Sequence, residues 1–310
     1  MPVSPLAPVR ARRGVPALTG TLALLLLVAA SPELAAQGVL DQVAGDYRDT
    51  SLEWIDRLIP VAQRLFMYLA AIEIAVSAVI WGLRRNGLDD VIGQFVLKVA
   101  ILALCFALIF SFEFWIPPIV DGFRDAGARA SGRPGYSPSQ IVDLGIDLYT
   151  EIVSGARDHS LLLNPILVLT LWIASVIIAL SFIAIAVQFV LILVNSYLVL
   201  SAGVVFLGFA GWRATAPLAD NYITYAIHVG IQLFMVTLLV GIGLDLAETW
   251  RGYVTTAGFT SFGPVFQVLG GTLVFAALVT TLPRSFARGI TGGVSLGLAN
   301  AVRSGGGSAA

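Results

Sequence analysis

Two ionisable side chains lie deep in long apolar stretches of this 310-residue chain. Glu73 lies in the stretch from Pro60 to Leu83, and Lys98 lies in the next one, from Val91 to Phe112. Counted from the turn at Asn86, Glu73 is thirteen residues back and Lys98 twelve forward, so an antiparallel helical hairpin places both at nearly the same depth. Because an unpaired charge inside a membrane is costly, we predict a structural ion pair. A proton- or ion-conducting role and rotation toward separate partners are the alternatives.

A second polar feature is His228, with Tyr225 one turn before it and Gln232 one turn after it. On a helix these residues share a face, which either lines a bundle interior or channel or simply packs through hydrogen bonds. The chain has only two His, one Cys and three Met, and it carries no HExxH, CxxC, Walker or GxGxxG pattern. We therefore expect no catalysis, no cofactor and no metal site.

The elements that position these residues follow from hydropathy. The chain is 57% hydrophobic and 12% charged, with a mean hydropathy of +0.88, whereas soluble proteins carry about 25% charged residues. A net charge of −1 gives no general attraction to nucleic acid. The sequence predicts an all-α, polytopic membrane helix bundle.

The longest uncharged stretch runs from Asn164 to Gly211. As one helix it would extend roughly 70 Å, against a hydrocarbon core of roughly 30 Å. It either turns near Gln188 to Ser196 into two spans, or forms one unusually long helix with a bent piece from Ser201 to Gly211. The positive-inside rule favours a single crossing, because Arg213 and the tail arginines then share one side with the short basic loop at residues 84–85.

The amino terminus reads as a signal-like leader. Arg10, Arg12 and Arg13 precede the apolar run from Leu18 to Ala30, with small residues up to Ala36 at possible cleavage points. An uncleaved first span is the alternative. Either way the chain continues outside the cytoplasm. Together with a single crossing of the central stretch, this start predicts five mature spans, with the N-terminus out and the C-terminus in.

Two regions outside the spans have amphipathic patterns. Residues 38–58 suit a helix lying at the outer interface, or a solvated lead-in. Ser139 to Ser154 repeats apolar residues at helical spacing among carboxylates, and Ser137 or Ser139 caps it. This acidic helix packs either on a partner or on its own membrane domain.

Small and basic residues complete the pattern. Small residues let helices approach closely or break, and five glycines have this role: Gly203, Gly208, Gly211, Gly230 and Gly241. Three arginines, Arg213, Arg284 and Arg288, form either a cytoplasmic basic mouth for phosphates or an ordinary topology signal.

The block VVFLGFAGWRATAPLADNYITYAIHVGIQLFMVTLLVGIG at 204–243 resembles the TrbL family of conjugative transfer proteins. These are related to the polytopic inner-membrane subunits of VirB-type type IV secretion systems. The closest points are residues 206–211 followed by Arg213, the approach at 219–225, and residues 230–234. The C-terminal PRSFARGITGGVSLG, at 283–297, also resembles the family.

The resemblance implies a structural channel component of the bacterial inner membrane, present in several copies and supporting pilus assembly. Implied partners are the pilin, core-complex proteins, ATPases and the lipid bilayer, with transient contact to single-stranded DNA and its relaxase or to protein substrates. The competing class is a secondary transporter or permease using buried Glu73, Lys98 and His228, although an odd span count and the lack of a repeat oppose it. A scaffold of another envelope complex is a third class.

With the resemblance included, the expected organisation has six parts. They are a signal peptide or first hydrophobic segment (1–36), a periplasmic amphipathic lead-in (37–59), a transmembrane hairpin (60–112), a periplasmic loop with an amphipathic helix (113–163), a transmembrane bundle (164–283) and a cytoplasmic tail (284–310).

Overall fold

The computed structural model describes residues 38–84, 88–132, 137–158, 164–257 and 262–292. The predicted leader, 1–36, lies outside the described residues. Within the described ranges the chain is all-helical. It forms seven α-helices and one 3₁₀ turn: α3 (Val39–Arg84), α4 (Leu88–Phe110), α5 (Phe112–Ala130), α6 (Pro138–Asp158), α7 (Pro165–Leu207), η1 (Gly208–Gly211), α8 (Ala216–Ala257) and α9 (Gly263–Thr291).

Five of these helices, α3, α4, α7, α8 and α9, are long and apolar enough to cross a membrane, which is the number that hydropathy predicts. They differ in how far their own chain covers them. In the most apolar stretch of each helix, the rest of the protein buries 61% of the residues in α7 and in α8, but only 28% in α3 and 22% in α4. Helices α7 and α8 therefore form the core, and α3 and α4 leave most of their apolar surface to lipid or to neighbouring subunits.

The central stretch is one helix. Helix α7 runs without interruption for 43 residues, about 65 Å at 1.5 Å per residue, and has no hairpin turn between Gln188 and Ser196. Both of those residues are buried in it. The expected bend starts later than predicted, because Gly203 stays helical and the backbone tightens only at Gly208. Helix α7 can be longer than the hydrocarbon core is thick, because neighbouring helices as well as lipid cover its apolar surface.

No break in the helix separates the predicted amphipathic lead-in from the predicted first span. Residues 39–84 form the single 46-residue helix α3, with Pro60 inside it. Pro60 is exposed and only removes one backbone hydrogen bond, whereas Ile55 before it and Ala62 and Phe66 after it are buried in one cluster. Continuous burial along this face, mainly against α7, carries the helix past the proline.

Helix α6 is the predicted acidic amphipathic helix. Ser137 and Gln140 form a reciprocal capping box, in which each backbone N–H donates to the other side chain at 3.3 Å. Asp41 of α3 accepts a further hydrogen bond from the Ser139 N–H at 3.2 Å. The apolar residues Ile141, Leu148 and Ile152 are buried. They belong to the same core as α7, so this helix rests on its own membrane domain.

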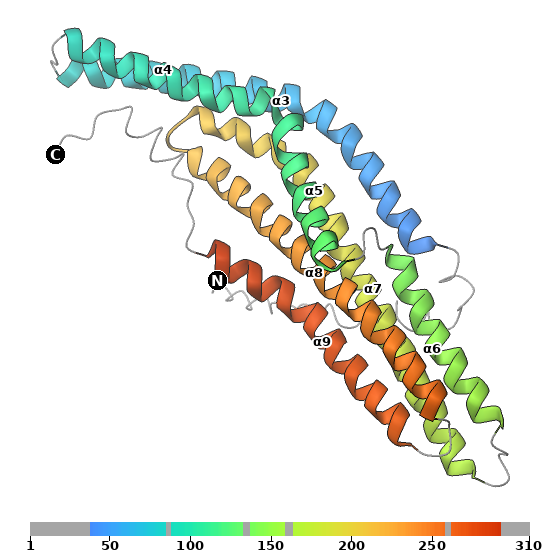
Figure 1. Cartoon of the computed structure of the whole chain (residues 1–310). Coiled ribbons are helices and arrows are strands. Elements are labelled where there is room, and N and C mark those ends of the chain that lie inside the picture. The colour runs from blue at the N-terminus through green and yellow to red at the C-terminus, as the bar shows by residue number, and fades with distance from the viewer. Residues whose placement is uncertain (1–37, 85–87, 133–136, 159–163, 258–261, 293–310) are drawn as a thin grey trace, which may run out of the picture.

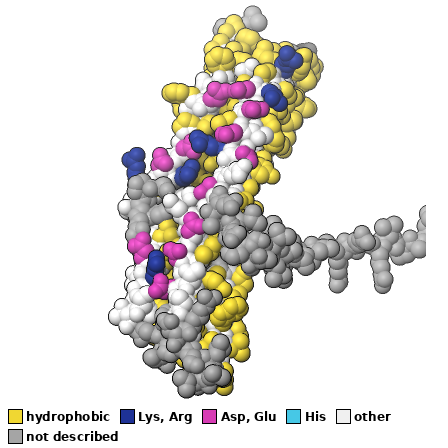
Figure 2. All heavy atoms as spheres, turned by 90° about the vertical axis from the view of Figure 1, so that its right-hand side faces the viewer, with side chains coloured by type: hydrophobic (Ala, Val, Ile, Leu, Met, Phe, Trp, Pro, Cys, Tyr) yellow, Lys and Arg dark blue, Asp and Glu magenta, His cyan; other side chains and the backbone are white. Residues whose placement is uncertain are grey.

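The outer face of α6 is negatively charged. Figure 2, which views the side of the molecule formed by α3 and α6, shows acidic side chains, with some basic ones among them, between apolar regions. Arg251 of α8 pairs with two of them, Asp147 at 3.4 Å and Glu151 at 3.6 Å. Partial burial, with Asp147 and Asp41 nearby, raises the pKa of Asp143 above its usual value.

The helices form two connected parts. Helices α5 to α9 pack side by side as an elongated bundle, whereas the paired α4 and C-terminal half of α3 extend beyond the ends of α7, α8 and α9 (Figure 1). We call this pair the α3–α4 arm. It meets the bundle at η1, where the two hydrophobic clusters of the protein adjoin.

Glycines mark the closest helix contacts. A Cβ atom at Gly203 would lie 1.9 Å from the Tyr222 ring, one at Gly230 2.6 Å from the Phe123 ring, and one at Gly243 1.8 Å from the Phe275 ring. The packing roles expected for Gly203 and Gly230 therefore correspond to close contacts. Gly241 is buried in α8. Gly145 and Gly127, which the sequence analysis did not single out, have equally tight contacts with Phe182 and with the Phe234 carbonyl.

The contact at Gly243 is testable against a matched site on the same helix. We expect Gly243→Ala to lower the free energy of unfolding by about 1–3 kcal/mol, because the new methyl group displaces the Phe275 ring. Gly252→Ala has open space around it and should stabilise α8 by up to about 1 kcal/mol. Thermal unfolding of both purified variants in detergent measures the difference. Equal shifts in one direction would contradict the packing described here.

Candidate functional site

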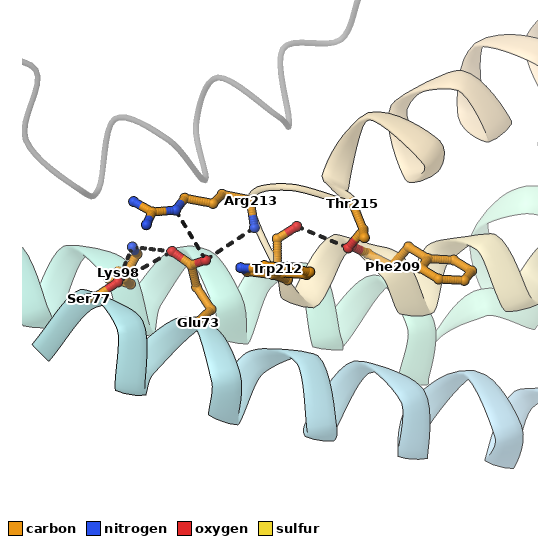
Figure 3. Close-up of polar contacts among 7 residues, drawn as sticks. All are labelled: Glu73, Ser77, Lys98, Phe209, Trp212, Arg213 and Thr215. Carbon is orange, nitrogen blue, oxygen red and sulfur yellow. Dashed lines mark hydrogen bonds and ion pairs between the residues drawn. The ribbon is translucent and has the colours of Figure 1, made fainter. Parts of the chain in front are cut away.

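Glu73 is the centre of a buried polar cluster at the junction of the α3–α4 arm with the bundle (Figure 3). Its carboxylate is fully buried and pairs with the Lys98 ammonium, which is 2% exposed. It also accepts hydrogen bonds from the Ser77 hydroxyl at 3.3 Å and from the Arg213 backbone N–H at 3.2 Å. The structure thus brings together the two charges that the sequence pairs, and it adds Arg213, whose Nε lies 3.8 Å from Glu73 Oε2.

Two neighbours of Lys98 come from the same face of α3 as Glu73. Lys98 Nζ donates to Ser77 Oγ at 2.7 Å, and it lies 5.9 Å from the centroid of the Trp81 ring, within cation–π range. Ser77 and Trp81 follow Glu73 by four and eight residues. The sequence analysis missed both, although their helical spacing from Glu73 was a usable signal.

The backbone turn after α7 presents Arg213 to this cluster. The Thr215 hydroxyl donates to the Phe209 carbonyl at 2.8 Å, and the Thr215 and Ala216 N–H groups donate to the Trp212 carbonyl. This turn packs directly on α3, and Gly208 and Gly211 make that possible. A Cβ at Gly208 would lie 2.7 Å from the Ala62 carbonyl oxygen, and one at Gly211 2.6 Å from that of Phe66. These two glycines thus serve close approach as well as ending the helix.

The cluster has one carboxylate and two cations with different surroundings. The Lys98 side chain is buried from solvent, whereas the Arg213 side chain is 31% exposed and keeps access to solvent. Buried ion pairs add little net stability, because desolvation offsets their attraction, but removing one partner is strongly destabilising. The cluster therefore fixes which segments meet at this point more than it adds to overall stability.

The predicted polar face of α8 forms a second site. His228 and Tyr225 have stacked rings with centroids 6.1 Å apart. His228 Nδ1 lies 2.9 Å from Thr291 Oγ1, and its Nε2 lies 2.8 Å from Gln232 Nε2. The Thr291 hydroxyl donates its own hydrogen to the Ala287 carbonyl, so His228 Nδ1–H donates to Thr291 and Nε2 accepts from Gln232. This network assigns a neutral imidazole with both nitrogens in use.

A cavity of about 490 Å³ adjoins this face. It joins residues that the sequence analysis treated separately, because two arginines of the expected basic mouth meet the polar stripe here. The residues lining it are Leu191, Ile192, Asn195, Tyr225, His228, Gln232, Arg284 and Arg288.

The three arginines of the expected basic mouth do not meet at one site: Arg213 contacts Glu73, whereas Arg284 and Arg288 line the α8–α9 cavity. The three residues of the transporter alternative are divided in the same way. Glu73 pairs with Lys98, while the described partners of His228 are Thr291 and Gln232. Position along α8 explains both results, because Arg213 precedes this helix, whereas His228 and the cavity beside it lie twelve residues, about 18 Å, further along it.

A substitution series at the ion cluster has a predicted order. Glu73→Gln should lower the free energy of unfolding by about 3–5 kcal/mol, because Lys98 is left buried without a counter-charge. Lys98→Met should cost less, since Arg213 and Ser77 still bond the carboxylate. The double variant should be more stable than Glu73→Gln alone. Thermal unfolding and the amount of folded protein in membranes measure the order.

The control is the exposed pair of Arg57 and Glu53, 3.3 Å apart on the same helix. Arg57→Gln should change stability by less than about 1 kcal/mol. A Glu73→Gln protein as stable as the parent chain but inactive would overturn the structural role and favour ion conduction through the pair.

The chain is similar to known proteins over most of its length. The family described as TrbL/VirB6 plasmid conjugal transfer protein matches residues 70–282. The chain is 30% identical over 278 residues to the conjugal transfer protein TrbL of Rhizobium radiobacter, covering 88% of this chain and 68% of that protein. It is 25% identical over 267 residues to a probable conjugal transfer protein TrbL of Sinorhizobium fredii, covering 83% of this chain and 64% of that protein. The chain thus spans about two thirds of the length of these relatives.

Proposed function

The chain belongs to the TrbL/VirB6 family of conjugal transfer proteins, and from this membership we propose that it is a channel and scaffold subunit surrounding a translocation path in the bacterial inner membrane. It is a multi-pass membrane component of a type IV secretion system and not an enzyme. The proposal adds its arrangement in several copies, its support of pilus assembly, and the passage of single-stranded DNA with a relaxase or of protein substrates.

The observation that carries the proposal is the extent of the family match. Residues 70–282 take in the Glu73 cluster, the η1 junction and the polar face of α8, so the match includes the features that set the shape of the molecule. A subunit that assembles with others in a membrane needs a defined shape and an apolar outer surface. The α3–α4 arm supplies such a surface, with Tyr68 71%, Leu83 78% and Phe110 72% exposed.

We propose an orientation with the N-terminus in the periplasm and the C-terminus in the cytoplasm. The arginines at 84–85, 213, 284 and 288 then lie toward the inner side, and Arg251 lies toward the outer side. The ion pairs of Arg251 with Asp147 and Glu151 support this arrangement, because they neutralise the basic residue that the rule places outside. The acidic face of α6 would be periplasmic.

The secondary transporter has weaker support. It requires ionisable groups that meet a substrate or ion together, but Glu73 and Lys98 are engaged with each other and His228 is neutral in a separate hydrogen-bond network. The pilin, core-complex proteins and ATPases remain the proposed partners of the secretion subunit.

Transfer frequency tests the function directly. A donor lacking this gene, with the other transfer genes intact and no paralogue, should lose conjugative transfer, and a complementing copy should restore it. Loss of the gene in the recipient alone should have no effect. Normal transfer from the mutant donor would overturn the proposed role.

Cysteine labelling tests the orientation. In a Cys105→Ser background, Thr150→Cys on the exposed side of α6 should react with a membrane-impermeant maleimide in intact spheroplasts, and Ser285→Cys on α9 only after permeabilisation. The reverse pattern would show the opposite orientation. Labelling of both positions in intact spheroplasts would show that the C-terminal end of α9 is outside.

A further inference from the structure

Two arginines on α9 share one helical face without an acidic partner. Arg284 and Arg288 are one turn apart and both line the α8–α9 cavity. In the described part of the chain neither guanidinium is paired with a carboxylate, and residues 284–310 contain no Asp or Glu. Like charges at this spacing repel each other, so an anion between them stabilises the arrangement.

The rest of the cavity adds hydrogen-bonding groups but no further charge. His228 is neutral, and both of its nitrogens are engaged with Thr291 and Gln232. The side chains of Asn195 and Tyr225 supply amide and hydroxyl groups on the same wall. Two guanidinium groups with neutral donors around them match a phosphate, which arginine binds in a bidentate manner.

The surroundings of the cavity indicate where the phosphate comes from. The apolar run of α9 ends at Leu282, two residues before Arg284, so the arginines sit where a span leaves the hydrocarbon region. Exposed apolar side chains continue the arginine side of α9 toward its N-terminus, at Leu273 and Val274. Leu191 of α7, 50% exposed, lines the cavity itself. A path for nucleic acid would be flanked by polar groups instead.

We propose that the α8–α9 cavity binds the headgroup of an anionic phospholipid. Arg284 and Arg288 hold the phosphate, Gln232 and Asn195 face the glycerol and ester groups, and the acyl chains lie along Leu273, Val274 and the apolar surface of α9. Basic pockets between membrane helices at the headgroup level bind anionic lipids in this way. The inference stands apart from the proposed transfer function, since it needs only the folded chain.

Native mass spectrometry of the purified chain, after delipidation and titration with phosphatidylglycerol, cardiolipin or zwitterionic phosphatidylethanolamine, tests this proposal. The parent chain should retain the two anionic lipids and release the zwitterionic one. Arg284→Gln/Arg288→Gln should weaken anionic lipid binding roughly thirtyfold, at about fivefold per arginine. The charge-matched control, Arg64→Gln/Arg129→Gln, changes two exposed arginines outside the cavity and should bind as the parent does.

Two further measurements identify the ligand. Inorganic phosphate and a single-stranded oligonucleotide are titrated against the lipids, and both should fail to displace bound cardiolipin. Equal displacement by phosphate would assign a simple anion site, and tighter binding of the oligonucleotide would assign a nucleic-acid contact; either result overturns the lipid proposal. Circular dichroism and gel filtration establish that the double variant is folded, so that unchanged lipid retention by a folded variant also overturns it.

Discussion

A single buried carboxylate holds together three segments that are far apart in the sequence. Glu73 of α3 bonds Lys98 of α4 and Arg213 after η1, and its carboxylate is fully buried. Because an isolated charge in an apolar medium is so unfavourable, the three segments either assemble in this arrangement or leave a charge without a partner. The position of the α3–α4 arm on the bundle depends on this requirement.

Elsewhere the bundle has few polar contacts between helices. Most buried hydroxyl groups bond within their own helix, as Ser196 does to the Leu193 carbonyl and Thr237 to the Leu233 carbonyl. Such bonds satisfy the side chain but do not select a partner helix. Selection therefore falls to shape, through glycines facing large rings, and to polar contacts, among which the Glu73 cluster and the His228 network are the most buried that the structure describes. This division suits a protein in a bilayer, where apolar surface alone does not tell one helix from another.

Hydropathy and spacing predicted much of this structure, and the failures have a common cause. The five apolar helices, the acidic helix α6 and the contact between Glu73 and Lys98 all follow from local periodicity or from counting along a hairpin. Arg213 could not be placed in the same way. Its position depends on Gly208 and Gly211 meeting the α3 backbone, which involves segments about 140 residues apart in the chain.

The continuity of α3 has a mechanical consequence. A helix of 46 residues is a rod about 69 Å long, and it connects the start of α6, through Asp41, to the tip of the α3–α4 arm. A displacement at one end of such a rod is transmitted to the other as a tilt. Its weakest point is Pro60, where one backbone hydrogen bond is missing. The η1 turn packs against Ala62, two residues further on. A tertiary contact therefore supports α3 next to the point where this helix bends most easily.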